Sequence, residues 1–175
     1  MIKPGQLLVA YPNLPQSSLF GNSVILITEH TDKGAAGLIL NKQSRLSTTE
    51  LLKDFPVEID PPIKVHTGGP VNSDAMVLLH SDEWYSTTTY QVPGGLALSS
   101  DLLMLEKFAQ GDRPLFWRLC IGMCGWMPGQ LESELGDQLW LTCDPEPAIM
   151  FEYTGRQQWR KALELCATQA VARYF

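Results

Sequence analysis

VILI at Val24–Ile27 and GLIL at Gly37–Leu40 are the two stretches of sequence that decide the fold. Neither stretch alternates apolar with polar residues, so each predicts a strand that is buried on both faces. The segment between them contains Asp32-Lys33-Gly34, which is typical of a hairpin turn because glycine readily adopts a positive φ. The sequence therefore predicts a buried β-hairpin.

Short apolar runs punctuated by Gly, Pro and Asn continue on both sides of this hairpin, and this pattern indicates further strands. We predict strands over Gln6–Ala10, Ser23–Glu29, Ala36–Leu40, Lys64–Thr67, Met76–His80, Phe116–Ile121, Gln138–Thr142 and Ala148–Phe151.

Helical signals interrupt these strands in four places. A capping-box pattern starts at Ser47, and the other helices are predicted over Asp101–Gly111, Pro128–Gly136 and Gln157–Ala172. The proline-rich stretch Pro56–Pro62 is expected to be a long loop. Because strands dominate the first half and helices are interspersed among them, the predicted class is α+β.

Composition and charge limit the kinds of protein this chain can be. Its 175 residues, 45% hydrophobic and 18% charged, predict one globular domain over residues 1–175. The net charge is −6 and the thirteen Lys and Arg residues are scattered, which argues against a nucleic-acid partner. We find neither a secretory signal pattern nor an apolar run long enough to span a membrane, so we expect a cytoplasmic protein without a membrane partner.

The four cysteines, Cys120, Cys124, Cys143 and Cys166, are expected to be free thiols that pack as small hydrophobic side chains. The spacing of Cys120 and Cys124 matches neither a redox motif nor a zinc motif. The residues around Cys124 nearly match a nucleophile elbow, but Trp126 stands where the second glycine is required. The three histidines also lack metal-ligand spacing, so we predict no metal site and no cofactor.

Two features at strand ends are candidates for ligand binding. Gly68-Gly69 follows a predicted strand, and it forms either a tight turn or a place where a ligand approaches main-chain N–H groups. His80 ends another predicted strand, where it either bonds a backbone group or takes part in a site.

A third candidate lies beside a glycine-rich bend. Trp126, Gln130 and Glu132 are placed where a polar pocket with an aromatic wall can form. Glu132 and Glu134 lie about 160° apart on a helical wheel, so they are poorly placed to act as an acid–base pair.

Residues spread over nearly the whole chain occur in the order of a known family. They are Gly5–Ala10 with Pro12, Phe20, Ser23–Ile25, Glu29-His30, Gly34-Ala35, Gly37–Lys42, Gly68–Val71, Leu79-His80, Gly125-Trp126, Gly129–Glu132, Glu134 and Trp140-Leu141. With these residues the chain resembles the AlgH/YqgE family of bacterial proteins. It departs from the family at Gln43, where proline is usual, and at Met123-Cys124, where Tyr-Ala is typical.

The resemblance implies an α+β fold with a bifurcated, mostly antiparallel β-sheet, part of which closes as a small barrel, surrounded by helices. It implies no activity, although one branch of the family is named for a proposed regulatory role in alginate production.

Three functions follow as hypotheses. The first is a non-enzymatic binding or regulatory module for a small molecule or a protein partner, with Asn41, Gly68, Gly69, His80, Trp126, Gln130 and Glu132 as candidate ligand-binding residues. The second is an enzyme that acts on a small molecule, and it requires His80, Asn41 and Glu132 to converge. The third is a transcriptional regulator, which requires a continuous basic stripe for DNA.

Overall fold

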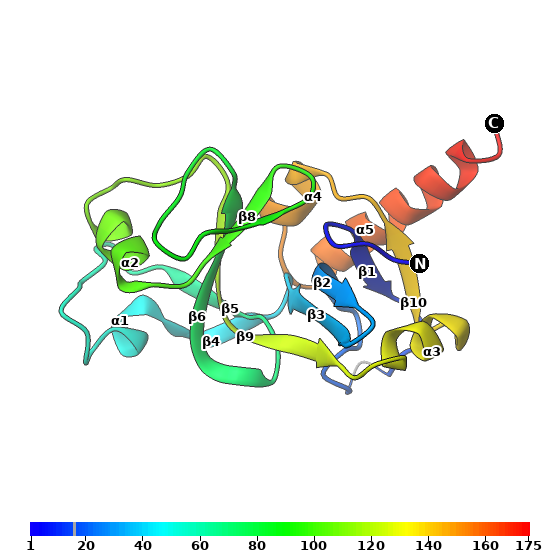
Figure 1. Cartoon of the computed structure of the whole chain (residues 1–175), viewed down its shortest axis with the longest axis horizontal. Coiled ribbons are helices and arrows are strands. Elements are labelled where there is room, and N and C mark those ends of the chain that lie inside the picture. The colour runs from blue at the N-terminus through cyan, green and yellow to red at the C-terminus, as the bar shows by residue number, and fades with distance from the viewer. Residues whose placement is uncertain (16) are drawn as a thin grey trace.

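A computed structural model describes residues 1–15 and 17–175, and within them it contains ten strands and five helices. The strands are β1 Leu7–Ala10, β2 Val24–Thr31, β3 Gly34–Ile39, β4 Gln43–Ser47, β5 Lys64–Thr67, β6 Val71–Ser81, β7 Tyr90–Val92, β8 Leu96–Ser99, β9 Trp117–Trp126 and β10 Trp140–Cys143. The helices are α1 Thr48–Leu51, α2 Leu102–Ala109, α3 Gln130–Gly136, α4 Pro147–Phe151 and α5 Gly155–Ala172 (Figure 1). Among these described helices, none has the length and apolar character needed to cross a bilayer.

The predicted hairpin is confirmed. β2 and β3 pair as antiparallel strands from Ile25–Ile39 to Thr31–Gly34, and Gly34 has a φ of +128° at the turn. The side chains of Val24–Ile27 are fully buried, as the lack of alternation predicted.

The sheet branches at β9. The first half of β9 pairs in parallel with β5 at Cys120 and Ile121, whereas its second half pairs with β3 from Cys124 to Trp126. The other edge of β9 pairs with β6, and the strand order of the main sheet is β10-β1-β2-β3-β9-β6-β8-β7. The α+β class and a bifurcated, mostly antiparallel sheet are therefore confirmed.

The main sheet curls into a half-barrel rather than the small closed barrel implied by the resemblance. Among the described residues, β10 and β7 are the two ends of the strand order. Because β10 and β7 do not pair with each other within the described residues, the strand order does not close into a ring.

The paired strands β6 and β9 separate two hydrophobic cores. Alternate residues of a strand face opposite sides of a sheet. Leu78 and Leu119 therefore enter a smaller core with α2, whereas Val77, Leu79 and Cys120 enter the larger core. Figure 1 shows α1 and α2 on one side of β6, and β1–β3 with α5 on the other.

Helix α4 and several strands differ from the sequence-based prediction. Ala148–Phe151, predicted as a strand, belongs to helix α4, because Pro147 occupies the first helical turn with a φ suited to a helix. A short apolar run does not distinguish the two states. Strands β4, β7 and β8 were not predicted, and β9 extends five residues beyond the predicted end at Ile121.

Glycines make the branch at β9 possible. The connection between β5 and β6 crosses β9 so closely that a Cβ added to Gly69 would lie 2.2 Å from the carbonyl carbon of Met123. A Cβ added to Gly122 would lie 2.2 Å from the carbonyl oxygen of Gly69. Both residues also have a positive φ, of +153° and +75°.

Gly68 joins three strands at the same crossing. Its N–H donates to the carbonyl of Ile121 on β9 at 2.7 Å, and its carbonyl accepts from the N–H of Ile39 on β3 at 2.8 Å. The structure thus places Gly68 and Gly69 in a close backbone crossing. The Gly68 N–H is used in this crossing, and a role of the two glycines in ligand binding stays a prediction.

Gly122→Ala is expected to lower the free energy of unfolding by about 1–3 kcal/mol more than Gly95→Ala, the typical cost of overpacking. The two glycines have nearly the same φ, +75° and +79°, but a Cβ at Gly95 meets nothing within 4 Å. Urea unfolding of both variants measures the difference. Equal losses would contradict the close crossing.

Candidate functional site

The side chain of Asn41 connects backbone segments through hydrogen bonds. Its Oδ1 accepts from the N–H of Val24 at 2.9 Å, and its Nδ2 donates to the carbonyls of Asn22 and Gly155 at 2.7 and 2.9 Å. Its own carbonyl accepts from the N–H of Gly155. Together these bonds connect the segment after β3 to the start of β2 and to the start of α5, so the buried amide orients the backbone.

His80 belongs to a buried chain of hydrogen bonds. Its Nδ1–H donates to the carbonyl of Ser81 at 2.8 Å, which leaves Nε2 to accept from the hydroxyl of Ser99 at 2.8 Å. The Thr89 hydroxyl lies 2.8 Å from the same Ser99 oxygen. Burial lowers the pKa of His80 and keeps the imidazole neutral. Because His80 and Ser99 are both buried, this Ser–His pair is out of reach of a substrate.

Trp126 and Gln130 both donate hydrogen bonds to Glu134, whereas the sequence grouped them with Glu132 in a candidate pocket. Glu134 accepts from the indole N–H groups of Trp126 and Trp140 at 3.0 and 2.8 Å, and from Nε2 of Gln130 at 3.0 Å. Trp126 also borders a small hollow of about 170 Å³. The carboxylate therefore holds α3 against β9 and β10.

Glu132 lies on the opposite side of α3 and pairs with His30. The His30 Nε2 is 2.5 Å from a Glu132 carboxylate oxygen, and its Nδ1–H donates to the carbonyl of Ile2. His80, Asn41 and Glu132 thus have separate sets of partners. Figure 1 also shows α3 well apart from the β8 strand that carries the partner of His80.

The cysteines are free and buried. Burial raises the pKa of Cys120 and of Cys124 to about 12, so neither thiol is ionised near neutral pH. A thiol must ionise to act as a nucleophile. This environment fits the expectation that they pack as hydrophobic side chains.

Arg118 is the polar residue that sequence reasoning missed. Only 7% of its surface is exposed, and its guanidinium donates to the carbonyls of Leu40 and Tyr153 and to Oε1 of Gln158, each at 2.7 Å. These neutral oxygens tie β9 to the end of β3 and to the connection between α4 and α5. The available signal was a lone charged residue inside an apolar strand pattern.

His66 on β5 lies next to this guanidinium. Its Nε2 is 2.8 Å from the hydroxyl of Thr154, the residue that precedes α5. Among the described residues, its buried Nδ1 has no hydrogen-bond partner. Burial, and secondarily the charge of Arg118, lower the pKa of His66 to about 4.

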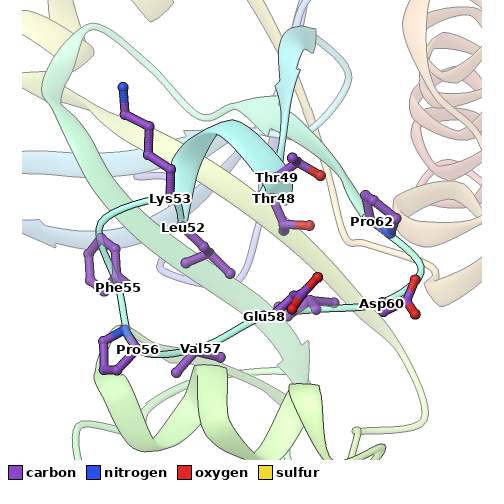
Figure 2. A pocket seen from close by; sticks show the side chains of 11 residues that line it. Thr48, Thr49, Leu52, Lys53, Phe55, Pro56, Val57, Glu58, Asp60 and Pro62 are labelled. Carbon is purple, nitrogen blue, oxygen red and sulfur yellow. The ribbon is translucent and has the colours of Figure 1, made fainter.

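A surface groove lies outside all of these positions, beneath α1. The loop after α1 is closed at its base because Thr48 N–H donates to the Ile63 carbonyl and Ile63 N–H donates to the Thr48 hydroxyl, both at 2.9 Å. Figure 2 shows this loop arching around a space into which Leu52 points, while the Lys53 side chain points away. The groove has a volume of about 480 Å³.

Two further hollows adjoin this groove. Phe55 borders both the groove and a hollow of about 200 Å³ at the start of α2, which also contains Leu102 and Asp101. Asp74 borders that hollow and a third one at residues 72–75 of β6. We call these three adjoining hollows the acidic furrow, because Glu58, Asp60, Asp74 and Asp101 line them against one cation, Lys53.

His66→Gln is expected to flatten the dependence of stability on pH. The unfolded chain binds a proton at this histidine near pH 6.5, whereas the folded chain does so only near pH 4. The free energy of unfolding therefore falls as the pH decreases through this window, by up to about 3 kcal/mol from this group. Glutamine can keep the bond to Thr154 but cannot titrate.

Urea unfolding at a series of pH values between these limits measures the effect. His80 is present in both proteins, so the difference between the two slopes reports His66 alone. Identical slopes would show that His66 is not held neutral by the fold.

Comparisons with known proteins agree on the family. The family model described as AlgH-like matches residues 7–171. A "UPF0301 protein" of Pseudomonas savastanoi pv. phaseolicola is 33% identical over 177 residues, covering 94% of this chain and 93% of the relative. A protein of the same name from Alcanivorax borkumensis is 36% identical over 176 residues, with the same coverage.

Solved structures match as well. The solution structure of the AlgH protein from Pseudomonas aeruginosa has a TM-score of 0.79 and 32% identity, and the match covers 93% of this chain and 87% of that one. A crystal structure of a Corynebacterium diphtheriae protein has a TM-score of 0.73 at 23% identity, covers 93% of this chain and 86% of that one, and supports the fold alone. On the family model, the relatives and the shared fold together, this chain belongs to the AlgH-like family.

Proposed function

We propose that this chain is a single AlgH-like domain over residues 1–175 that acts in the cytoplasm as a non-enzymatic binding module. It docks an extended segment of a protein partner in the acidic furrow. The observation that carries the proposal is the presence of two exposed apolar side chains, Phe55 and Leu102, among four carboxylates.

The apolar part of the furrow supports a protein partner. Phe55 is 44% exposed and Leu102 is 42% exposed, although both sit beside the buried core residues Leu52 and Leu105. Adjoining apolar side chains that remain in solvent often mark an interaction site. The hollows follow one another along the surface, which suits an extended segment better than a compact small molecule.

The charge of the furrow supports a basic partner. Glu58, Asp60 and Asp74 are exposed, and Asp101 remains ionised because hydrogen bonds from Ser86 and Thr88 outweigh burial and lower its pKa to about 2. Complementary charge steers association and fixes the register of a bound segment. The partner segment therefore carries Lys or Arg next to the apolar side chains that contact Phe55 and Leu102.

The two other hypotheses gain less support. An enzyme at His80, Asn41 and Glu132 needs one shared reacting centre, but each of these side chains bonds different groups. A DNA-binding role needs a basic surface, whereas the furrow and the chain as a whole carry an excess of negative charge.

Titration of the ¹⁵N-labelled protein with a flexible peptide of alternating lysine and leucine tests the proposal. We expect saturable shifts of the amide signals of residues 53–60, 72–76 and 101–105, and weaker binding at higher salt because the rim charges are screened. A peptide of alternating glutamate and leucine is expected not to bind.

A pair of charge-matched variants separates docking from general attraction to an acidic protein. Glu58→Lys with Asp74→Lys is expected to weaken binding about thirtyfold, since each reversed rim charge changes the energy of binding by roughly 1 kcal/mol. Asp137→Lys with Glu146→Lys makes the same change of net charge at exposed residues outside the furrow and should leave binding nearly unchanged. Equal weakening by both pairs would refute a site in the furrow.

A further inference from the structure

A second hollow, of about 250 Å³, lies between β5 and β9. The two strands pair only at His66–Cys120 and Thr67–Ile121. If the same register continued toward the N-terminal ends of the two strands, Lys64 would lie opposite Arg118. The described residues do not form this pair, so the two strands are unpaired at this position. The hollow is lined by the residues on either side of this unpaired position, namely Ile63, Lys64, His66, Trp117, Arg118 and Leu119.

The lining divides into a cationic part and an apolar part. Because side chains alternate along a strand, Lys64 and His66 share one face of the sheet with Arg118. Trp117 and Leu119 point to the other face, where both pack against the smaller core. A molecule in the gap between the two strands therefore borders cationic residues of one face and apolar residues of the other.

The cationic part has no negative partner. Among the residues that the structure describes, no carboxylate lines this hollow, and the guanidinium of Arg118 donates to neutral oxygens only. No hydrogen bond within the described ranges uses its Nε–H. Burying a charge without a counter-ion is unfavourable, so a bound anion would stabilise this arrangement.

We propose that the hollow between β5 and β9 binds a small organic carboxylate, with its anionic group toward Arg118 and Lys64 and its apolar body against Trp117. A carboxylate accepts charge-assisted hydrogen bonds from guanidinium and ammonium groups. The volume is below the 300–1,000 Å³ typical of drug-sized ligands, which points to a small acid rather than a nucleotide.

His66 can take part without a change of its neutral state. If the Thr154 hydroxyl donates to Nε2, the ring proton resides on Nδ1, which is the nitrogen without a partner among the described residues. The imidazole that lines the hollow is then neutral and has one N–H without a partner within the described residues. This site is separate from the acidic furrow and does not depend on the docking function proposed above.

Phenylacetate is the probe, and phenylacetamide is its neutral counterpart. We expect phenylacetate to shift the side-chain Nε–H signal of Arg118 and the indole N–H signal of Trp117 in a saturable way in ¹H–¹⁵N spectra. Phenylacetamide and acetate are expected to bind more weakly, because one lacks the charge and the other lacks the apolar body.

Lys64→Gln tests whether the charge of Lys64 contributes to binding, without disturbing the buried guanidinium of Arg118. Lys64 is exposed, so the variant should fold, and its affinity for phenylacetate should fall about threefold to fivefold, as for a partly exposed ion pair. Lys3→Gln is the matched control, because it removes the same charge from an exposed residue elsewhere. Trp117→Leu is expected to weaken phenylacetate more than acetate.

Three results would overturn the proposal. Equal binding of phenylacetate and phenylacetamide would remove the role of charge. Equal losses in Lys64→Gln and Lys3→Gln would place the binding elsewhere. Saturable shifts of the Arg118 signal with inorganic phosphate but not with phenylacetate would show that the hollow binds an inorganic anion and not an organic carboxylate.

Discussion

The close crossing of the β5–β6 connection over β9 is the constraint on which the rest of the structure depends. At Gly69 and Gly122 two backbones approach to a distance that excludes any side chain. This approach lets β9 leave β5 and join β3 while β6 stays paired along its other edge. The irregular part of β6 that follows the crossing forms one end of the acidic furrow, whereas the cationic hollow lies at the opposite end of the short β5–β9 pairing.

The buried polar groups and the surface hollows have different roles in this account. Asn41 and Arg118 use their hydrogen-bonding groups to join segments distant in sequence, whereas His80 and Glu134 join neighbouring strands and helices. Such buried networks fix a unique arrangement of strands when they are satisfied. The hollows, in contrast, expose apolar side chains next to charged groups, and they are therefore the places where a ligand or partner gains most.

Short sequence patterns were sufficient to predict the elements that form through contacts between residues close together in the chain. The β2–β3 hairpin followed from its apolar runs and Gly34, and the α1 capping box from Ser47 and Glu50, whose reciprocal bonds the structure contains. Arg118 could not be placed in this way, because its acceptors are 33 to 78 residues away in the chain. Likewise, only the rotation of α3 against β9 decides that Glu134, and not Glu132, meets Trp126.

Native-state hydrogen exchange tests the central claim most directly, namely that the branch at β9 joins both cores into one cooperative unit. The account predicts that the N–H groups of Ile39, Thr67 and Gly68, which form the bonds of the branch, exchange only through global unfolding. Buried amides of both cores, such as Leu26 and Leu78, should show the same free energy and the same denaturant dependence. Exchange of the α2 side of the molecule at a distinctly lower free energy than the β1–β3 side would contradict it.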